Sequence, residues 1–168
     1  MQIIDIPTAI KILQNSGIVA FPTETVYGLG AVATDPQAIA KVYEAKNRPR
    51  DNPLICHFSS ITQIQYYDIL LSPIELILLE ELTPGPLSIL VNLPKNSPLK
   101  AAANNLPTVI CRIPKHKIAL ELITSLKKPI AAPSANTSTR PSCTSSQMVL
   151  NDLGKKIDGV LDGQTSEI

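Results

Sequence analysis

Short apolar runs alternate along this chain with stretches whose apolar residues recur at helical spacing. Each short run has the length of a strand and is bounded by proline, glycine or polar residues, so we expect strands there. These predicted strands are residues 17–21, 53–58, 87–93, 108–113, 129–133 and 158–161. The helical spacing predicts helices over residues 7–16, over 61–82 with a break near Ser72-Pro73, and over 115–126. The pattern from Ile74 to Glu81 is amphipathic.

Two more helices are indicated by their first residues. In Asp35-Pro36 a capping carboxylate precedes a proline at the first helical position. Thr144 and Gln147 have the spacing of a capping box, and the helix that they open is expected to end at Gly154. Helices and strands therefore intermix along the whole chain, which predicts the α/β class with one mixed sheet.

Composition sets limits on what such a domain does. With 168 residues, of which 44% are apolar, the chain is long enough for one domain with a real core. Aromatic residues make up 4% and Trp is absent, which argues against binding single-stranded nucleic acid by stacking. The three cysteines are widely spaced, which favours neither a disulfide scaffold nor a zinc site; Cys56 and Cys111 lie in apolar runs and are expected in the core.

Charge is nearly balanced overall but uneven along the chain. The formal net charge is +1, which gives no global attraction to DNA or RNA. Basic residues gather at 41–50 and at 112–128, and these two stretches either line one anion-binding cleft or are scattered, solvated surface charges. We find no signal peptide and no apolar span of about 18 residues, so a cytoplasmic protein without membrane contact is expected.

Four polar segments leave the ends of predicted buried strands, and ligands bind at that edge of open α/β sheets. The first, FPTETVYGLG at residues 21–30, offers hydroxyls and one carboxylate. In the second, Pro49 keeps Arg48 out of helical geometry, and in an extended run Lys46 and Arg48 would point together at one anion, for which phosphate is the usual candidate. His57 stands near the end of the next strand, where a lone histidine is more often a structural residue than a ligand contact.

The other two segments repeat this arrangement. Arg112 lies in the apolar strand 108–113, and a buried guanidinium there needs a partner, which is either an internal acid or a substrate carboxylate. Ser134 and Asn136 follow the strand 129–133 with a spacing of two residues. Taken singly, each segment could be an ordinary turn with local hydrogen bonds. Their recurrence after buried strands favours a common functional edge.

Together the motifs FPTETVYGLG, KNRPRDNPLICH, TPGPLSIL, VICRIP and AAPSANTSTRPS resemble the YrdC/Sua5 family, over nearly the whole chain. The resemblance implies a single domain, residues 1–168, with a twisted, open mixed sheet and a concave, positively charged cavity. It implies threonine contacts for Thr25, His57 and Arg112. It implies ATP contacts for Arg48, Asn52, Thr108, Ser134 and Ser142. Lys46, Arg48, Ser134 and Asn136 match the family's catalytic signature.

The activity implied by the resemblance is the synthesis of threonylcarbamoyl-AMP from L-threonine, bicarbonate and ATP, with Mg²⁺ accompanying ATP and no metal site in the protein itself. Its product serves N6-threonylcarbamoyladenosine formation at position 37 of tRNA, through a separate transferase complex. The family normally continues past the end of this chain, with a further ATP-contacting arginine, so this chain is expected to lack that segment. Two alternatives are a non-enzymatic RNA-binding module, disfavoured by the balanced charge, and a carbamoyl-adenylate-forming relative, found within much longer proteins.

Overall fold

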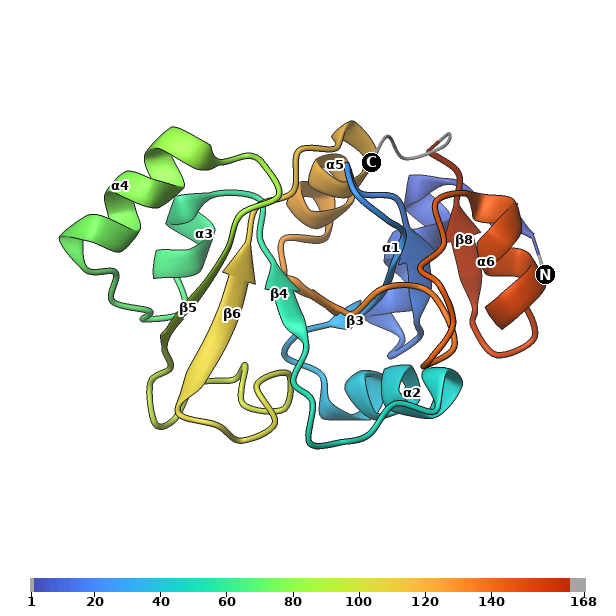
Figure 1. The fold of residues 1–168 in the computed structure, drawn as a ribbon, viewed down its shortest axis with the longest axis horizontal. Helices are drawn as coiled ribbons and strands as arrows, with labels where there is room; N and C mark the ends of the chain where they lie inside the picture. The colour runs from blue at the N-terminus through green and yellow to red at the C-terminus, as the bar shows by residue number, and fades with distance from the viewer. Residues whose placement is uncertain (1, 164–168) are drawn as a thin grey trace.

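The protein folds around one mixed sheet of eight strands (Figure 1), as seen in a computed structural model that describes residues 2–163. The strands are β1 (Ile3–Ile4), β2 (Val19–Phe21), β3 (Gly28–Val32), β4 (Ile55–His57), β5 (Ser88–Asn92), β6 (Thr108–Arg112), β7 (Ile130–Ala132) and β8 (Gly159–Leu161). The helices are α1 (Ile6–Gln14), α2 (Pro36–Lys46), α3 (Ile61–Gln65), α4 (Pro73–Leu82), α5 (Lys117–Leu126) and α6 (Ser146–Leu153). The predicted α/β class and mixed sheet are confirmed.

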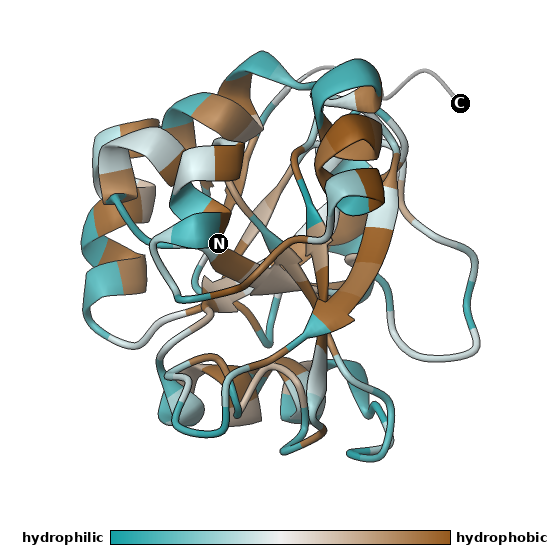
Figure 2. Cartoon of the chain, turned by 90° about the vertical axis from the view of Figure 1, so that its left-hand side faces the viewer, coloured by the Kyte–Doolittle hydropathy of each residue, from teal (hydrophilic) through white to brown (hydrophobic). Residues whose placement is uncertain are grey.

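The strand order is β1-β8-β2-β3-β7-β4-β6-β5. β4 and β6 run parallel, as do β1, β8 and β2, while the remaining neighbours are antiparallel. Helices α1 and α5 pack together over β2, β3 and β7, with Phe21 and Leu122 among their shared buried residues. A second core lies on the opposite face, beneath α2 and α6. Figure 2, viewed from the end that carries α3 and α4, shows the strands lying between helices on either side.

One region of the first face carries no helix among the described residues. Along β5 the residues alternate between exposed and buried, with Ile89 and Val91 turned toward the second core and Leu90 exposed. Along β6, Thr108, Ile110 and Arg112 are half-buried on the same side as Leu90, because Leu90 and Ile110 are register partners. From this open part of the sheet, Arg112 lines the cavity described below.

Local signals explain most of the element boundaries. The Asp35 carboxylate accepts hydrogen bonds from the backbone of Gln37 and Ala38, so the predicted cap is confirmed. The capping box predicted at Thr144 and Gln147 is wrong, because Ser145 caps α6 by accepting from the Met148 backbone, and the Gln147 side chain donates to Asn151 instead.

Two strands were not expected from the sequence. β3 includes the last three residues of the polar segment, two of them glycines, so its composition is that of a loop, yet all five residues are buried between β2 and β7. β1 has only two residues, and it pairs with β8. Among residues 2–163 no helix combines the length and apolar character needed to cross a membrane.

Candidate functional site

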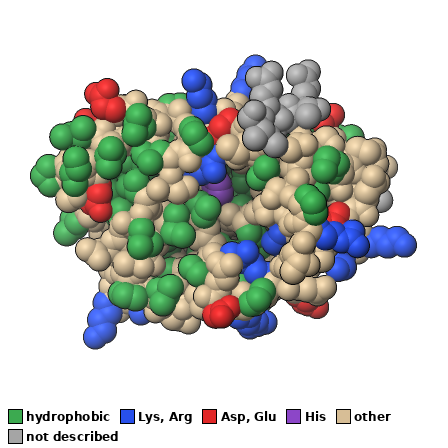
Figure 3. Space-filling view, viewed as in Figure 1, with side chains coloured by type: hydrophobic (Ala, Val, Ile, Leu, Met, Phe, Trp, Pro, Cys, Tyr) green, Lys and Arg blue, Asp and Glu red, His purple; other side chains and the backbone are tan. Residues whose placement is uncertain are grey.

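A cavity of about 190 Å³ opens where the β2–β3 loop meets β4, β6 and the end of β7. It is lined by Thr23, Thr25, Val26, Tyr27, Gly28, Ile55, His57, Arg112, Ala132, Pro133 and Ser134. Figure 3 shows a hollow in this face, with a histidine and basic side chains visible in and beside it. All four polar segments found in the sequence therefore contribute to the cavity, the second of them through Ile55 and His57 at its end.

The sheet places His57 and Arg112 side by side. They are register partners on the parallel strands β4 and β6, so their side chains leave the sheet on the same face. His57 is buried, and its Nδ1 lies 3.1 Å from the Ile55 carbonyl oxygen. Burial and the positive charge of Arg112 lower the pKa of His57 to about 4, so the ring is neutral at pH 7.

Arg112 has an internal partner, which answers a question that the sequence left open. Its Nη2 donates to Glu24 Oε1 at 2.7 Å and to Thr25 Oγ1 at 3.2 Å, and both charged side chains are largely buried. Within the described residues, Arg112 Nε and Glu24 Oε2 are buried without a hydrogen-bond partner. The ion pair is therefore made through one nitrogen and one oxygen, which leaves the remaining N–H groups of the guanidinium available to a ligand.

Backbone and side-chain hydrogen bonds shape the loop that carries Glu24 and Thr25. Thr23 Oγ1 donates to the Val26 carbonyl at 2.7 Å and accepts from the Thr25 backbone at 3.2 Å. The Tyr27 N–H donates to the Cys143 carbonyl, and the buried Tyr27 hydroxyl accepts from the Gly163 backbone. The loop is thus a formed structure, which holds the Thr25 hydroxyl against Arg112.

The predicted extended run from Lys46 to Arg48 is wrong at its first residue. Lys46 is the last residue of α2, because the helix continues to it before Asn47 adopts a left-handed backbone conformation. The Lys46 side chain is buried, and its ammonium group donates to the carbonyl oxygens of Ser134 and Asn136. Burial, helped by the nearby charge of Arg48, lowers the pKa of Lys46 to about 8.

Arg48 is fixed by a different set of contacts. Its Nε donates to the Asn52 carbonyl and its Nη2 to the Pro53 carbonyl, both at 3.2 Å. The Asn52 side chain is exposed, while its carbonyl also accepts from the Tyr43 hydroxyl. Lys46 and Arg48 therefore lie close enough for their charges to interact, but they point at different carbonyl groups in this state.

The segment after β7 is tied to the rest of the molecule at several points. Its Asn136 is buried, and the amide nitrogen donates to the carbonyls of Thr137 and Arg140. The Asp152 carboxylate of α6 accepts from the Thr137 backbone at 2.7 Å and from its hydroxyl at 2.9 Å. In the same segment, Ser134 lines the cavity and its carbonyl accepts from the Lys46 ammonium group, so it links the two.

Four of the five predicted ATP contacts do not line this cavity, and of the five only Ser134 does. Thr108 begins β6, on the face of Arg112 but at the other end of the strand, and Ser142 is exposed beside the buried Cys143. Two residues important to the site's geometry were not predicted as site residues, Glu24 and Asp152. The sequence offers one signal for Glu24, namely a carboxylate within a loop otherwise rich in hydroxyls, and none that we recognise for Asp152.

The two basic stretches of the sequence behave differently from one another. The first supplies Lys46 and Arg48 near the cavity, and the second supplies Arg112 within it. The lysines that follow Arg112, at positions 115, 117, 127 and 128, are exposed. Each stretch thus combines site cations with solvated surface charges.

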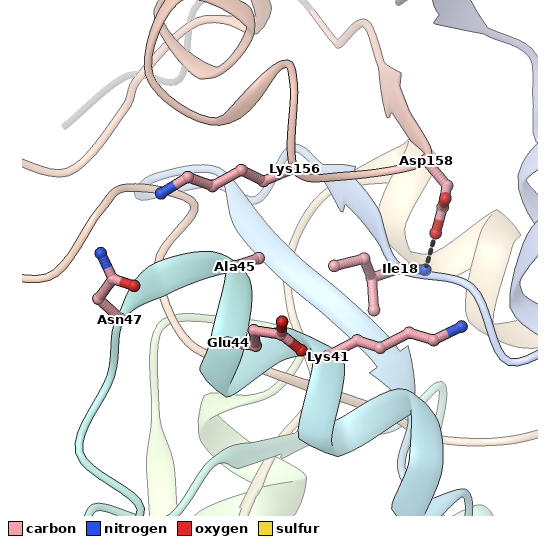
Figure 4. Close-up of a pocket in the computed structure, with 7 residues that line it drawn as sticks. All are labelled: Ile18, Lys41, Glu44, Ala45, Asn47, Lys156 and Asp158. Atoms are coloured by element: carbon pink, nitrogen blue, oxygen red, sulfur yellow. Dashed lines mark hydrogen bonds between the residues drawn. The ribbon is translucent and has the colours of Figure 1, made fainter.

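A larger cavity, of about 500 Å³, lies between α2 and the segment before β8 (Figure 4). Its charges are mixed, because Lys41 and Lys156 line it together with Glu44 and Asp158. Lys41 donates to the Ser16 carbonyl at 2.7 Å, and Asp158 accepts from the Ile18 backbone at 2.8 Å. None of the predicted site residues lines this cavity, and two of its four charged groups already have protein partners.

Within residues 2–163 no three His, Cys, Asp or Glu side chains are grouped so as to hold a metal ion. Cys56 and Cys111 are fully buried, which confirms them as core residues, and burial raises the pKa of the Cys56 thiol to about 12.

Comparison with known proteins gives this geometry a context. A family model covering Sua5, YciO and YrdC, described as telomere recombination, matches residues 11–168. The chain belongs to the Sua5/YciO/YrdC family. Within that family, it is 43% identical to a threonylcarbamoyl-AMP synthase of Pyrococcus abyssi over 93% of its own length and 46% of that protein. It is 42% identical to the threonylcarbamoyl-AMP synthase of Bacillus subtilis, over 94% of this chain and 46% of that protein.

The fold comparison agrees with the sequence comparison. The crystal structure of P. abyssi Sua5 complexed with L-threonine superimposes with a TM-score of 0.92 at 42% identity, over 97% of this chain and 48% of that one. The chain therefore spans about half the length of these Sua5/YciO/YrdC relatives, and the match includes every segment that lines the cavity.

Proposed function

We propose that this chain catalyses the formation of threonylcarbamoyl-AMP from L-threonine, bicarbonate and MgATP. The observation that carries the proposal is the meeting of Thr25, His57 and Arg112 in one small cavity. At about 190 Å³ the cavity is smaller than the roughly 300–1,000 Å³ pockets of drug-sized ligands, and so it suits an amino acid. The names of the relatives, and the L-threonine bound by P. abyssi Sua5, support the same substrate.

In this proposal each of the three residues binds a different part of threonine. Arg112 donates to the carboxylate through the N–H groups that Glu24 and Thr25 leave free. The Thr25 hydroxyl and the neutral His57 ring supply polar partners for the rest of the amino acid. Because these groups stand on a loop and two paired strands, the site is largely formed before the substrate arrives.

The chemistry needs positioning and charge stabilisation rather than a covalent nucleophile. Bicarbonate takes up a proton and loses water to give CO₂. The neutral amine of threonine then adds to the carbon, and the proton that the amine loses as the carbamate forms balances the one that bicarbonate took up. A carbamate oxygen then attacks the α-phosphorus of ATP, and the bond to the bridging oxygen breaks to release pyrophosphate. Negative charge builds on the α-phosphoryl oxygens, so fixed cations contribute most of the protein's assistance.

We assign the ATP side of the site to Arg48, Asn52, Thr108, Ser134 and Ser142, with Lys46 and Asn136 completing the signature. The contacts of Ser134 support its part, because it lies between the cavity and Lys46. An ammonium group has three donors, and two of those of Lys46 go to backbone carbonyls, which leaves one for a phosphate oxygen. The product would pass to a transferase that modifies tRNA. The cytoplasmic location of the protein stays a prediction.

The test is threonine-dependent release of pyrophosphate from MgATP by the purified chain in bicarbonate buffer. We expect release that depends on both threonine and bicarbonate. Arg112→Lys should raise the threonine concentration needed for half-maximal release at least tenfold, because the single ammonium group of lysine does not replace the paired N–H donors of the planar guanidinium. The same exchange at the exposed Arg140, Arg140→Lys, should leave that concentration unchanged. Salt-sensitive binding of RNA without any pyrophosphate release would instead support the RNA-binding alternative.

A further inference from the structure

Glu24 places a negative charge directly beside the cation assigned to the substrate carboxylate. Its Oε1 lies 2.7 Å from Arg112 Nη2, and the two side chains are 17% and 12% exposed. Glu24 stands between Thr23 and Thr25, which line the cavity, but it does not line the cavity itself. It therefore acts on a ligand through its charge and through Arg112, without touching the ligand.

At the cavity the positive charge of Arg112 is balanced by Glu24, its ion-pair partner, while the nearby cations Lys46 and Arg48 do not line the cavity. Arg112 contributes one positive charge and Glu24 one negative charge, at a spacing that couples them strongly. The other ionisable groups near Glu24 are the two histidines, and burial lowers the pKa of both His57 and His116, so they are neutral at pH 7. A ligand that brings only a carboxylate would leave a buried surplus of negative charge, whereas one that also brings an ammonium group would not.

We propose that Glu24 is a specificity-determining residue that makes the Arg112 cavity select zwitterionic α-amino acids over carboxylic acids that lack the α-ammonium group. This inference rests on the proposed function, because it takes the carboxylate of the substrate to bind Arg112. Arg112 alone would attract any small carboxylate. The charge of Glu24 removes that general attraction and favours the ligand whose own positive charge lies next to its carboxylate.

Glu24→Gln separates this role from a structural one. Glutamine has the same shape and keeps an acceptor for Arg112 Nη2, but it removes the charge. Glu80→Gln, on the exposed side of α4, is the matched control for losing one carboxylate elsewhere. The probes are L-threonine and two of its analogues. In 2,3-dihydroxybutanoate a hydroxyl replaces the amine of threonine. L-threoninamide keeps the ammonium group and lacks the carboxylate.

Calorimetric titration of the three proteins with the three ligands gives the result. In Glu24→Gln, dihydroxybutanoate should bind more tightly relative to threonine, by on the order of 10- to 100-fold, because a buried charge several ångströms away is removed. Threoninamide should bind more weakly in the same variant. These opposite shifts cannot come from general damage to the site. Glu80→Gln should leave all three affinities unchanged.

The remaining outcomes are distinct. If Glu24→Gln leaves the preference for threonine over dihydroxybutanoate unchanged, or weakens all three ligands equally, Glu24 does not set specificity and this inference is overturned while the proposed function stands. If the unmodified chain binds no threonine, the proposed function falls and this inference falls with it.

Discussion

Lys46 shows at the scale of one residue how a cation that we assign to the ATP side of the site also holds the structure together. Its ammonium group donates to two carbonyls of the segment after β7, and its side chain is 1% exposed. Lys46→Met keeps most of the apolar part of the side chain but leaves the carbonyl oxygens of Ser134 and Asn136 without this hydrogen-bond donor. We therefore expect it to lower the free energy of unfolding by about 1–3 kcal/mol. Arg48→Ala, at a half-buried position, should cost about 1 kcal/mol or less.

Urea unfolding of the two variants measures this difference. Sequence considerations alone predict little loss of stability for either, because Lys46 and Arg48 look like a repelling pair on one extended strand. Equal stability of Lys46→Met and the unmodified protein would show that the carbonyls of Ser134 and Asn136 find other donors, and that Lys46 serves the ligand alone.

His57 should make the stability of the protein depend on pH. Its pKa is lowered from 6.5 to about 4 in the folded state, so between these values the unfolded chain binds more protons than the folded one. Stability is therefore highest above pH 6.5 and falls as the pH drops toward 4, by about 2 kcal/mol between pH 7 and pH 5. His57→Gln should remove that share of the pH dependence, as read from urea midpoints at the two pH values. An unchanged dependence would contradict the neutral, buried ring.

Whether a residue's role in the site could be predicted depends on the signal that it leaves in the sequence. Arg112 stands out because a guanidinium in an apolar strand needs a partner, but the sequence could not choose between an internal acid and a ligand. The partner, Glu24, is 88 positions away in the chain and is brought to Arg112 only by the order of strands in the sheet. Asp152 likewise acquires its role from tertiary contacts with Thr137.

At the scale of elements, strands with clear apolar runs were predicted and the strand β3 was not. Its glycines lower strand propensity, but Gly30 packs so closely that an added Cβ would stand 2.5 Å from Ile130 Cγ2. Tertiary packing therefore decides the element against local preference. In α4, periodicity predicted an amphipathic helix but could not orient it: Ile74 and Ile77 are exposed, whereas Leu79 is fully buried.

This orientation of α4 leads to a stability prediction. Leu79→Ala removes a fully buried side chain and should destabilise the protein by about 2–5 kcal/mol. Ile77→Ala, on the same helix but 54% exposed, should change stability by no more than about 0.5 kcal/mol. Alanine is the better helix former at both positions, slightly more so where it replaces Ile than where it replaces Leu, and this small difference is well below the packing loss expected at Leu79 in chemical denaturation. A larger loss at Ile77 would mean that the helix is turned the other way.

At the scale of the whole molecule, the cavity lies across the join between two halves of the sheet. β3 and β7 connect them through only two register pairs, Ala31 with Ala131 and Val32 with Ile130, and the Gly28–Ser134 bridge extends the contact. The cavity takes Thr25 from one side of this join and His57 and Arg112 from the other. A ligand held by all three would connect the halves directly.

Hydrogen exchange should reveal that connection. Threonine at about 100 times its dissociation constant adds about 2.7 kcal/mol to the stability of the folded state, so amides that exchange only by global unfolding should slow about 100-fold. We expect slowing on both sides of the join, in residues 19–32 and in residues 108–113. Amides of α4, which has Leu79 as its one fully buried residue, are expected to open locally and to change little. The Arg112→Lys protein at the same threonine concentration is the control, and because its affinity is lowered at least tenfold its slowing should fall to about tenfold or less. Protection confined to residues 19–32 would mean that threonine does not reach β4 and β6, and that the cavity residues do not act as one site.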